Sequence, residues 1–499
     1  MNYNVIYINY KGKKGKEMYE NNEYSFPDFE DTKIESLLKN GNSNKFINSL
    51  DDSKINLSKT MVIQKILPVM LTRGLTSIDQ SENFFIFSEY KFTPFSFFYN
   101  QNKIGFAKGK ELKLNFPSPS YIDHCEMNLT ANLTKANVFN GLKIEEKLGL
   151  VLIDVQISKR FKGLMAKMMK SAVSNFFSRK PVSLPVSIFE PKSMLQRITD
   201  YFSFAPEFLL KSSKEDNCLE RLKLIITYSI SGLYTASKQL KPFNPLLGET
   251  FEGVFADNSR VYCEQISHYP TVARFYLKDV DNNYTFHGFY DIATVNKHLG
   301  KKITVIQGGP NIVEIKKYNS KIVYNLPKIN MLNCDSEVNR STYWKSVMVF
   351  VDTQNGLKAV LKFGKNHSNV NTFEGYIVSF SFPKNYVFNI KEEVVKAKKF
   401  FKEKNQVFLS RINGNWLDHI KFDEKVYWNI DDYSPITIKP VEDVIPSDSR
   451  FREDLIWLFR CFSAKNEEDK KRFEDFSQNW KYLLEAIQRS DRELRKSKK

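Results

Sequence analysis

The sequence has few of the residues and patterns that carry familiar catalysis or metal binding. Its five cysteines are scattered and never form a CxxC pair, so neither a zinc site nor a disulfide framework is indicated, and a reducing compartment fits. The six histidines are equally dispersed and suggest no metal site. The chain has no GxSxG elbow, no GxxxxGKS/T phosphate loop and no HExxH pair. We therefore expect no metal, no cofactor and no enzymatic activity.

Long apolar runs are also missing. The N-terminal residues lack a basic segment followed by an apolar stretch. No later stretch approaches about eighteen uninterrupted apolar residues, the length at which a membrane-spanning helix is indicated. The sequence therefore predicts neither a secretory signal nor a membrane span, and it favours a cytoplasmic location.

What the chain does have is size, aromatic content and positive charge. At 58.3 kDa, with 42% hydrophobic and 14% aromatic residues, it can bury a substantial core in two or three domains, or in one large domain with an extension. The net charge of +17 and the pI near 9.3 favour an anionic partner, which could be nucleic acid, an anionic membrane surface or a phosphorylated small molecule. Charge alone does not choose among these three kinds of partner. A Lys-rich protein without any anionic partner is equally consistent with it.

Composition divides the chain into parts. Residues 1–60 are rich in Asn, Lys, Asp, Glu and Ser, which is typical of a flexible arm. Residues 61–155 contain short aromatic and β-branched runs broken by Asn, Gly and Pro, and these predict a small β-rich region of unknown role. Between 250 and 440, short alternating runs recur between Asn, Asp and Gly turns. This pattern favours an antiparallel sheet closing toward a barrel over an α/β fold.

Helices are expected around this sheet. The segment 193–202 reads as helical with Ser193 as its N-cap, and a second helical stretch lies near 220–237. The C-terminal residues, from about 466 to 497, have strong helical propensity and one apolar stripe.

The segment 161–179 has the spacing of an amphipathic helix, with lysines opposite its apolar face and Pro181 beyond its end. Two interpretations stay open. The helix packs on the core, or it is a basic amphipathic helix that touches membrane or closes over an apolar ligand, a surface for which methionine is well suited. The residues expected to make the apolar contact are Leu164, Met165, Met168, Met169 and Phe176.

Basic and amide side chains occur in separated motifs. The prolines and glycine of KPFNPLLG restrict the backbone, so this turn would present Lys241 and Asn244 at a fixed place, as phosphate recognition requires. Lys481, Glu485 and Arg489 lie at i, i+4 and i+8 of the C-terminal helix and share one face. From spacing alone, a solvated row of ion pairs is the favoured interpretation of that face.

Together these motifs resemble the lipid-binding domain of the oxysterol-binding-protein-related family. Five segments match in the family's order, and they are LPVSIFEPKSMLQRITDYF, KPFNPLLGETFE, EQISHYPT where the family typically has EQxSHHPP, IPSDSRFREDL and KYLLEAIQR. The match covers roughly Leu164 to the C-terminus, about two thirds of the chain. It implies an α+β fold in residues 156–499, an incomplete antiparallel β-barrel that encloses an apolar lipid tunnel with a lid and flanking helices.

The resemblance also implies a carrier whose cargo is bound lipid. Such a protein extracts a sterol or a phospholipid such as phosphatidylserine into its tunnel and often exchanges it for phosphatidylinositol 4-phosphate between membranes. The helix at 161–179 falls where the family has its lid. The implied headgroup residues are Lys241, Asn244, His268, Tyr269, Lys481, Glu485 and Arg489.

Tyr269 departs from the family pattern, which has a second histidine at this position. A tyrosine hydroxyl donates one hydrogen bond but carries no positive charge near neutral pH. An aromatic side chain packed at the rim of the tunnel explains Tyr269 equally well.

Other functions and partners follow from the same motifs. The alternative is a membrane-recruited sensor or scaffold that binds phosphoinositide or sterol without substantial transfer. A nucleic-acid binder rests on net charge alone, so we expect membrane lipids and anionic membrane surfaces, at organelle contact sites, rather than nucleic acid. The segment around Phe84 and Phe85 weakly resembles a two-phenylalanine peptide that docks on endoplasmic-reticulum receptors, although an ordinary buried strand is favoured there.

Overall fold

The computed structural model describes the chain in separated stretches. They are residues 78–81, 84–86, 141–154, 157, 159–160, 184–235, 240–268, 270–297, 301–334, 336, 339–364, 368–403, 407–441 and 447–497. Only the backbone is described at 78–81, 84–86, 297, 440, 483 and 486–497. The arm predicted at 1–60, the helix predicted at 161–179 and Tyr269 lie outside the described residues. The chain divides into two compact units, one with residues 1–120, 443–447 and 493–499 and one with 121–442 and 448–492.

The first unit contains a short antiparallel hairpin. β1 (Ile78–Ser81) pairs with β2 (Phe84–Ile86), with Ile78 opposite Ile86 and Ser81 opposite Phe84. Phe84 and Phe85 therefore lie in a strand, while receptor docking through them stays a prediction.

The second unit is built on one large antiparallel sheet. In β8 the alternate residues Val261, Cys263 and Gln265 are buried, whereas Arg260 and Tyr262 are exposed, which is the pattern of a strand with one solvated face. The strands of this sheet are β3 (Leu142–Glu145), β4 (Gly149–Leu152), β7 (Thr250–Val254), β8 (Arg260–His268), β9 (Thr271–Lys278), β10 (Tyr284–Lys297), β11 (Lys302–Gly308), β12 (Asn311–Ile315), β13 (Ser320–Tyr324), β14 (Lys328–Leu332), β15 (Ser341–Asp352), β16 (Leu357–Phe363), β17 (Thr372–Ser379), β18 (Ser410–Asn415), β19 (His419–Phe422), β20 (Lys425–Asn429) and β21 (Lys439–Pro440).

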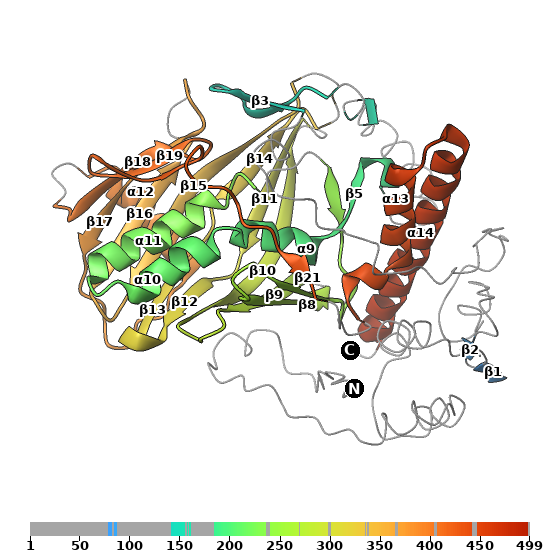
Figure 1. Ribbon diagram of the computed structural model, residues 1–499, viewed down its shortest axis with the longest axis horizontal. Helices are drawn as coiled ribbons and strands as arrows, with labels where there is room; N and C mark the ends of the chain where they lie inside the picture. Colours follow the sequence, from blue (N-terminus) through green and yellow to red (C-terminus); the bar gives the residue numbers. More distant parts are fainter. Residues whose placement is uncertain are drawn as a thin grey trace. The chain divides into compact units, whose positions relative to one another are not determined.

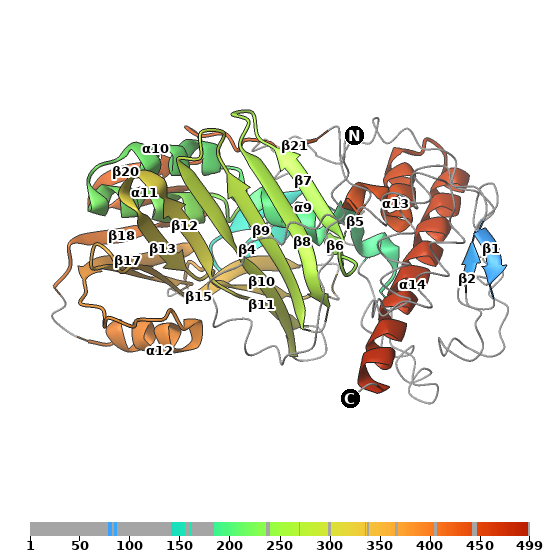
Figure 2. The same ribbon diagram turned by 90° about the horizontal axis from the view of Figure 1, so that it is seen from below.

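The sheet curls into a barrel (Figures 1 and 2). Two pairs of strands join its two longest strands, β10 and β15. β12 and β13 connect the N-terminal half of β10 to the C-terminal end of β15, and β11 and β14 connect the other halves. All ladders between the described strands of this sheet are antiparallel. The predicted α+β fold with a large antiparallel β-barrel and flanking helices is confirmed.

The hairpin of β3 and β4 belongs to the barrel sheet. Leu150 and Val151 of β4 pair with Thr342 and Ser341 at the start of β15. Val151 is 4% exposed and Leu150 is fully buried, so the hairpin contributes to the core. The segment 61–155 was predicted as a separate region, but part of it is therefore an extension of the barrel. The other boundaries predicted for that region stay predictions.

Helices on the inner side of the sheet complete its main core. Ser193 caps α9 by accepting a hydrogen bond from the backbone N–H of Leu195, as predicted, and Asn217 caps α11 in the same way. The ring of Phe202 lies 5.0 Å from the rings of both Phe275 and Phe286, which joins the helical segment to the strands. These helical segments are η4 (Val186–Ile188), α9 (Met194–Thr199), η5 (Asp200–Phe202), the π-helical turn η6 (Ala205–Leu209), α10 (Leu210–Lys214) and α11 (Cys218–Ser231); a further short helix, η7 (Lys316–Tyr318), joins β12 to β13.

A second core lies beside the barrel. β5 (Phe189–Ser193) pairs in parallel with β6 (Lys241–Phe243), and both pack against α13 (Glu453–Ser463), which follows η8 (Ser449–Phe451). α14 spans Glu467–Ser497, against a predicted range of about 466 to 497. It is tied to the segment before β5 because Gln478 Oε1 accepts a hydrogen bond of 2.7 Å from the backbone N–H of Val186. This arrangement brings the first and last family motifs together.

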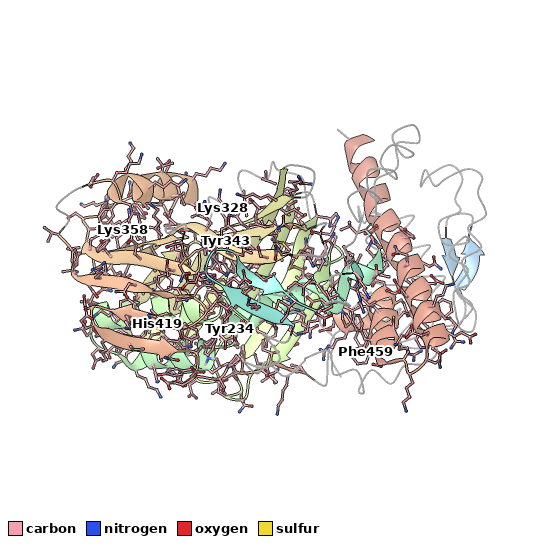
Figure 3. The ribbon with its side chains drawn as sticks, turned by 90° about the horizontal axis from the view of Figure 1, so that it is seen from above. Tyr234, Lys328, Tyr343, Lys358, His419 and Phe459 are labelled. Carbon is pink, nitrogen blue, oxygen red and sulfur yellow. The ribbon has the colours of Figure 1, made fainter. Side chains whose placement is uncertain are left out.

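The helix α12 (Ile390–Phe400) covers the outer surface of β15 and β16. Lys358 of β16 lies under it and donates a hydrogen bond of 2.5 Å to the buried Glu393 (Figure 3). None of the helices in the described part of the chain combines the length and the hydropathy that a membrane span requires.

Candidate functional site

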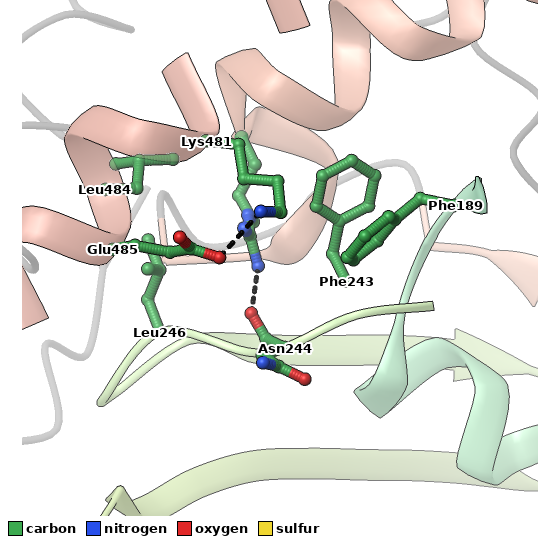
Figure 4. Close-up of a pocket in the computed structure, with 8 residues that line it drawn as sticks. Phe189, Phe243, Asn244, Leu246, Lys481, Leu484 and Glu485 are labelled. Atoms are coloured by element: carbon green, nitrogen blue, oxygen red, sulfur yellow. Dashed lines mark hydrogen bonds and ion pairs between the residues drawn. The ribbon is translucent and has the colours of Figure 1, made fainter. Parts of the chain in front are cut away.

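Segments that are far apart in the sequence meet at a small pocket in the second core (Figure 4). β5 and β6 form its floor, with Phe189 opposite Lys241 in the parallel ladder. The turn after β6, the start of α13 and one face of α14 form the rest. The lining residues are Phe189, Phe243, Asn244, Leu246, Arg452, Lys481, Leu484 and Glu485.

Lys241 adjoins this pocket and is held by the turn that follows it. Its Nζ donates to Asn244 Oδ1 at 2.8 Å and to the carbonyl oxygen of Pro242 at 3.0 Å. Gly248, with a positive φ of 78°, completes the turn. Burial, together with the nearby positive charge of Lys481, lowers the pKa of Lys241 to about 7. The turn therefore fixes an ammonium group that gains or loses its proton near neutral pH.

Lys481 enters the same site from α14. Only 3% of the residue is exposed. Its Nζ donates to the carbonyl oxygen of Leu184 at 2.8 Å and forms an ion pair with Glu485 Oε1, also at 2.8 Å (Figure 4). Burial lowers the pKa of Lys481, and the carboxylate of Glu485 opposes that shift. Glu485 thus favours the charged form of a buried ammonium group.

The ring of Phe189 lies beneath both ammonium groups. Lys241 Nζ is 4.7 Å and Lys481 Nζ 5.1 Å from its centroid. A cation over an aromatic face is stabilised by about 0.5–1 kcal/mol at exposed sites and by about 2 kcal/mol when it is desolvated. Phe189 therefore offsets part of the repulsion between two positive charges, and it was not among the predicted site residues.

Arg452 is a second residue that sequence reasoning missed. Its guanidinium is buried and pairs with Glu249 at 3.0 Å and with Asp454 at 2.6 Å. It also donates a hydrogen bond of 2.7 Å to the backbone carbonyl of Asn244. Arg452 thereby joins the start of α13 to the turn that presents Lys241. The motif that contains it, IPSDSRFREDL, was recognised, but nothing in that motif indicates its distant partner.

The part of the chain that forms this pocket is also the part that matches known proteins. The family model described as oxysterol-binding protein matches residues 165–499. The chain belongs to the oxysterol-binding protein family. As a family member it is a lipid-binding protein and not an enzyme.

Individual relatives are moderately similar in sequence. Oxysterol-binding protein 9 of Dictyostelium discoideum is 28% identical over 379 residues, which are 71% of this chain and 83% of that protein. Oxysterol-binding protein-related protein 2 of Mus musculus is 30% identical over 204 residues, 39% of this chain and 41% of that protein. This chain therefore aligns with less than half of the mouse relative.

Solved structures of related domains resemble the fold. The Osh3 ORD of Saccharomyces cerevisiae, crystallised in complex with PI(4)P, has a TM-score of 0.48 at 20% identity and covers 66% of this chain and 84% of that one. The Osh1 ORD domain in complex with cholesterol has a TM-score of 0.48 at 19% identity, with 72% and 86% covered.

The structure brings together only some of the residues that were predicted to bind the headgroup. Asn244, Lys481 and Glu485 line one pocket, and Lys241 is bonded to Asn244 at its edge. His268 ends β8, where its backbone carbonyl accepts a hydrogen bond of 3.2 Å from the Thr271 hydroxyl, and it is not among the lining residues.

Other predicted site residues lie beyond what the structure describes. Arg489 is on α14, but its side chain is outside the described part. Tyr269 is outside it too, as are the predicted lid contacts Leu164, Met165, Met168, Met169 and Phe176. The described residues contain no cluster of His, Cys, Asp and Glu that could hold a metal ion.

Proposed function

We propose that this protein binds the headgroup of phosphatidylinositol 4-phosphate at the Lys241 and Lys481 site and exchanges that lipid for a sterol between membranes. The observation that supports the proposal most directly is the meeting of two ammonium groups and an amide from segments that are remote in sequence. An anionic headgroup would relieve the repulsion between these charges.

The charges of the site fit a phosphorylated headgroup. A phosphomonoester carries about 1.5 to 2 negative charges at pH 7, and charged lysines bind it with charge-assisted hydrogen bonds. Lys241 and Lys481 are the better placed cations, because Arg452 is engaged by two carboxylates, Glu249 and Asp454, whereas Lys481 pairs with one, Glu485. Glu485 repels phosphate, so its carboxylate orients Lys481 or accepts hydroxyl groups of the inositol ring. His268 and Arg489 stay candidates for further contacts.

The barrel interior supports a sterol as the second lipid. Tyr201 accepts a hydrogen bond of 3.2 Å from Gln307 Nε2, and its ring lies 6.2 Å from Tyr290 and 6.1 Å from Trp344. Tyr290 Oη, Gln307 Oε1 and Trp344 Nε1 are buried and have no hydrogen-bond partner among the described residues. Buried polar atoms without partners are costly, so this cluster favours a cargo with a small hydroxyl group over phosphatidylserine, whose headgroup is charged.

Transfer between liposomes tests the headgroup site. Lys241→Ala, or Lys481→Ala combined with Arg489→Ala, should abolish transfer of phosphatidylinositol 4-phosphate from donor to acceptor vesicles. Lys321→Ala removes a lysine that is exposed on β13 and serves as the matched control. Normal transfer by both site variants would show that the assigned headgroup site is wrong.

Sterol retention tests the interior cluster separately. Gln307→Leu with Tyr290→Phe should reduce the sterol that copurifies with the protein, measured by mass spectrometry, and should leave phosphoinositide binding intact. Equal loss of both lipids would point to a damaged barrel instead of a lost contact.

The alternative, a sensor or scaffold that binds lipid without moving it, is distinguished by comparing binding with transfer. A carrier depletes donor vesicles of the lipid that it binds, whereas a sensor binds without depleting them. A cytoplasmic protein that associates peripherally with membranes fits both.

A further inference from the structure

A surface at the C-terminal end of α12 combines exposed apolar side chains with lysines. Val407 is 91%, Phe408 46% and Leu409 48% exposed. These three consecutive residues lead into β18, and the exposed residues Lys398, Lys399 and Lys402 precede them. We call these six residues the α12 patch.

The apolar part of the patch is held in place from below. The backbone N–H of Leu409 donates a hydrogen bond of 2.7 Å to the carbonyl oxygen of Ile377 in β17. The ring of Phe408 lies 5.1 Å from that of Tyr376, which also contacts the rings of Phe400 and Phe401. Because its base is fixed, little conformational freedom would be lost when the exposed side chains bind something.

The charge of the patch favours an anionic partner. Among the described residues of 398–409, three lysines are exposed against a single exposed carboxylate, Glu403. Exposed lysines and large apolar side chains within one segment are the composition by which a protein surface binds an anionic bilayer. The apolar groups enter the boundary with the acyl chains, and the ammonium groups stay among the headgroups.

A membrane fits this patch better than a protein does. A stable protein complex buries about 800 Å² on each partner, contributed by about 20–30 residues. The patch has six residues, and a bilayer needs no complementary shape. We infer that the α12 patch is a docking surface for membranes rich in anionic phospholipid. α12 and α14 lie at opposite ends of the second unit in both views (Figures 1 and 2), so this surface is separate from the headgroup site.

Vesicle binding by the full chain tests this inference. The probe is vesicles of phosphatidylcholine with phosphatidylserine and without any phosphoinositide, compared with vesicles of phosphatidylcholine alone. Val407→Asp with Leu409→Asp should lower the partition coefficient onto the anionic vesicles about tenfold, because each change removes an apolar side chain and adds a negative charge. Val280→Asp is the control, since Val280 is 68% exposed in the turn between β9 and β10.

Further variants separate the contribution of the lysines from that of the apolar side chains. Reversing charge with Lys398→Glu, Lys399→Glu and Lys402→Glu should weaken binding to the anionic vesicles and reduce its dependence on salt. Lys321→Ala, which removes an exposed lysine on β13, should bind these vesicles as the natural protein does. Because the vesicles contain no phosphoinositide, a failure of the headgroup proposal would not affect this result. Unchanged binding by the Val407 and Leu409 variant, or an equal loss in the Val280 control, would overturn the inference. The inference would also be overturned if the Val407 and Leu409 variant bound vesicles normally but no longer bound an acidic protein partner.

Discussion

Lys481 and Glu485 form an ion pair across one turn of α14, with Nζ and Oε1 2.8 Å apart, in a site where Lys481 is almost completely buried. The carboxylate is adjacent to the ammonium group that the proposed headgroup would approach. The site therefore contains its own anion, and a phosphate that binds Lys481 must share that ammonium group with Glu485 or displace it.

Replacing Glu485 with glutamine should lower the pKa of Lys481. Burial already lowers it, and the variant loses the charge that opposes this effect. The pH dependence of chemical modification of the Lys481 amine, followed by mass spectrometry, measures the shift. Glu392→Gln, which removes the carboxylate of an exposed pair on α12, should leave Lys481 unchanged. An identical titration of Lys481 with and without Glu485 would contradict the prediction.

Replacing Arg452 with methionine should destabilise the fold by about 3–5 kcal/mol, because it leaves the buried carboxylates of Glu249 and Asp454 without their cation. Urea unfolding measures the loss. Arg260→Met is the matched control. Its ion pair with Glu252 is half-exposed, and an exposed pair contributes about 0–1 kcal/mol. Similar losses in the two variants would mean that the Arg452 pairs add little net stability.

Binding of an anionic headgroup should weaken as pH rises above about 7, because Lys241 then loses its proton. Dissociation constants for the phosphoinositide measured across this range should increase, and Lys241→Arg, which stays charged, should flatten the profile. A profile that is equally steep in the arginine variant would assign the titration to another group.

Lys241 has a second pH effect, on folding, with the opposite sign. Its pKa falls from 10.5 to about 7 on folding, so the unfolded chain binds more protons between these values. Protonation of this one group therefore disfavours folding fully below about pH 7, and the penalty disappears as pH rises toward 10.5. Lys241→Gln should remove this component from the stability profile measured by urea unfolding, and an unaltered profile would contradict it.

Replacing Phe189 with leucine should weaken phosphoinositide binding and lower the pKa of Lys241 further, because the aromatic face that stabilises its charge is lost. The expected loss is about 0.5–2 kcal/mol. Phe189→Tyr keeps the ring and should restore both properties. The lysine titration can be followed without lipid, so it separates a role of the ring in holding charge from a loss of packing against Phe243. If leucine and tyrosine behaved alike, the ring would have no electrostatic role.

The sequence predicted the elements that depend on local patterns. Alternation in segments such as β8 indicates strands, and Ser193 is recognisable as an N-cap because capping depends on neighbouring backbone groups. The Lys241 turn was predictable for the same reason. Arg452 was not, since its role depends on Glu249, 203 residues earlier in the chain. The place of the β3–β4 hairpin on β15 is likewise a long-range pairing that no local pattern specifies.

The family motifs predicted more of the site than the spacing of its residues did. Spacing alone favoured a solvated row of ion pairs for Lys481 and Glu485, whereas Lys481 is buried and both line a pocket with Asn244. The difference arises because α14 packs against the segment before β5, a contact between the first and last motifs.

The barrel also constrains how the chain can be made. β4 pairs with β15, and β7 pairs with β21 as well as with its neighbour β8, so two early segments depend on strands that are synthesised much later. Closing such long loops costs entropy and slows folding, and strand edges that wait for partners promote aggregation. We therefore expect the nascent chain to need protection until Lys439 and Pro440 have left the ribosome. A chain truncated before Lys439 should aggregate more than the full chain during synthesis, and equal solubility would count against this order of events.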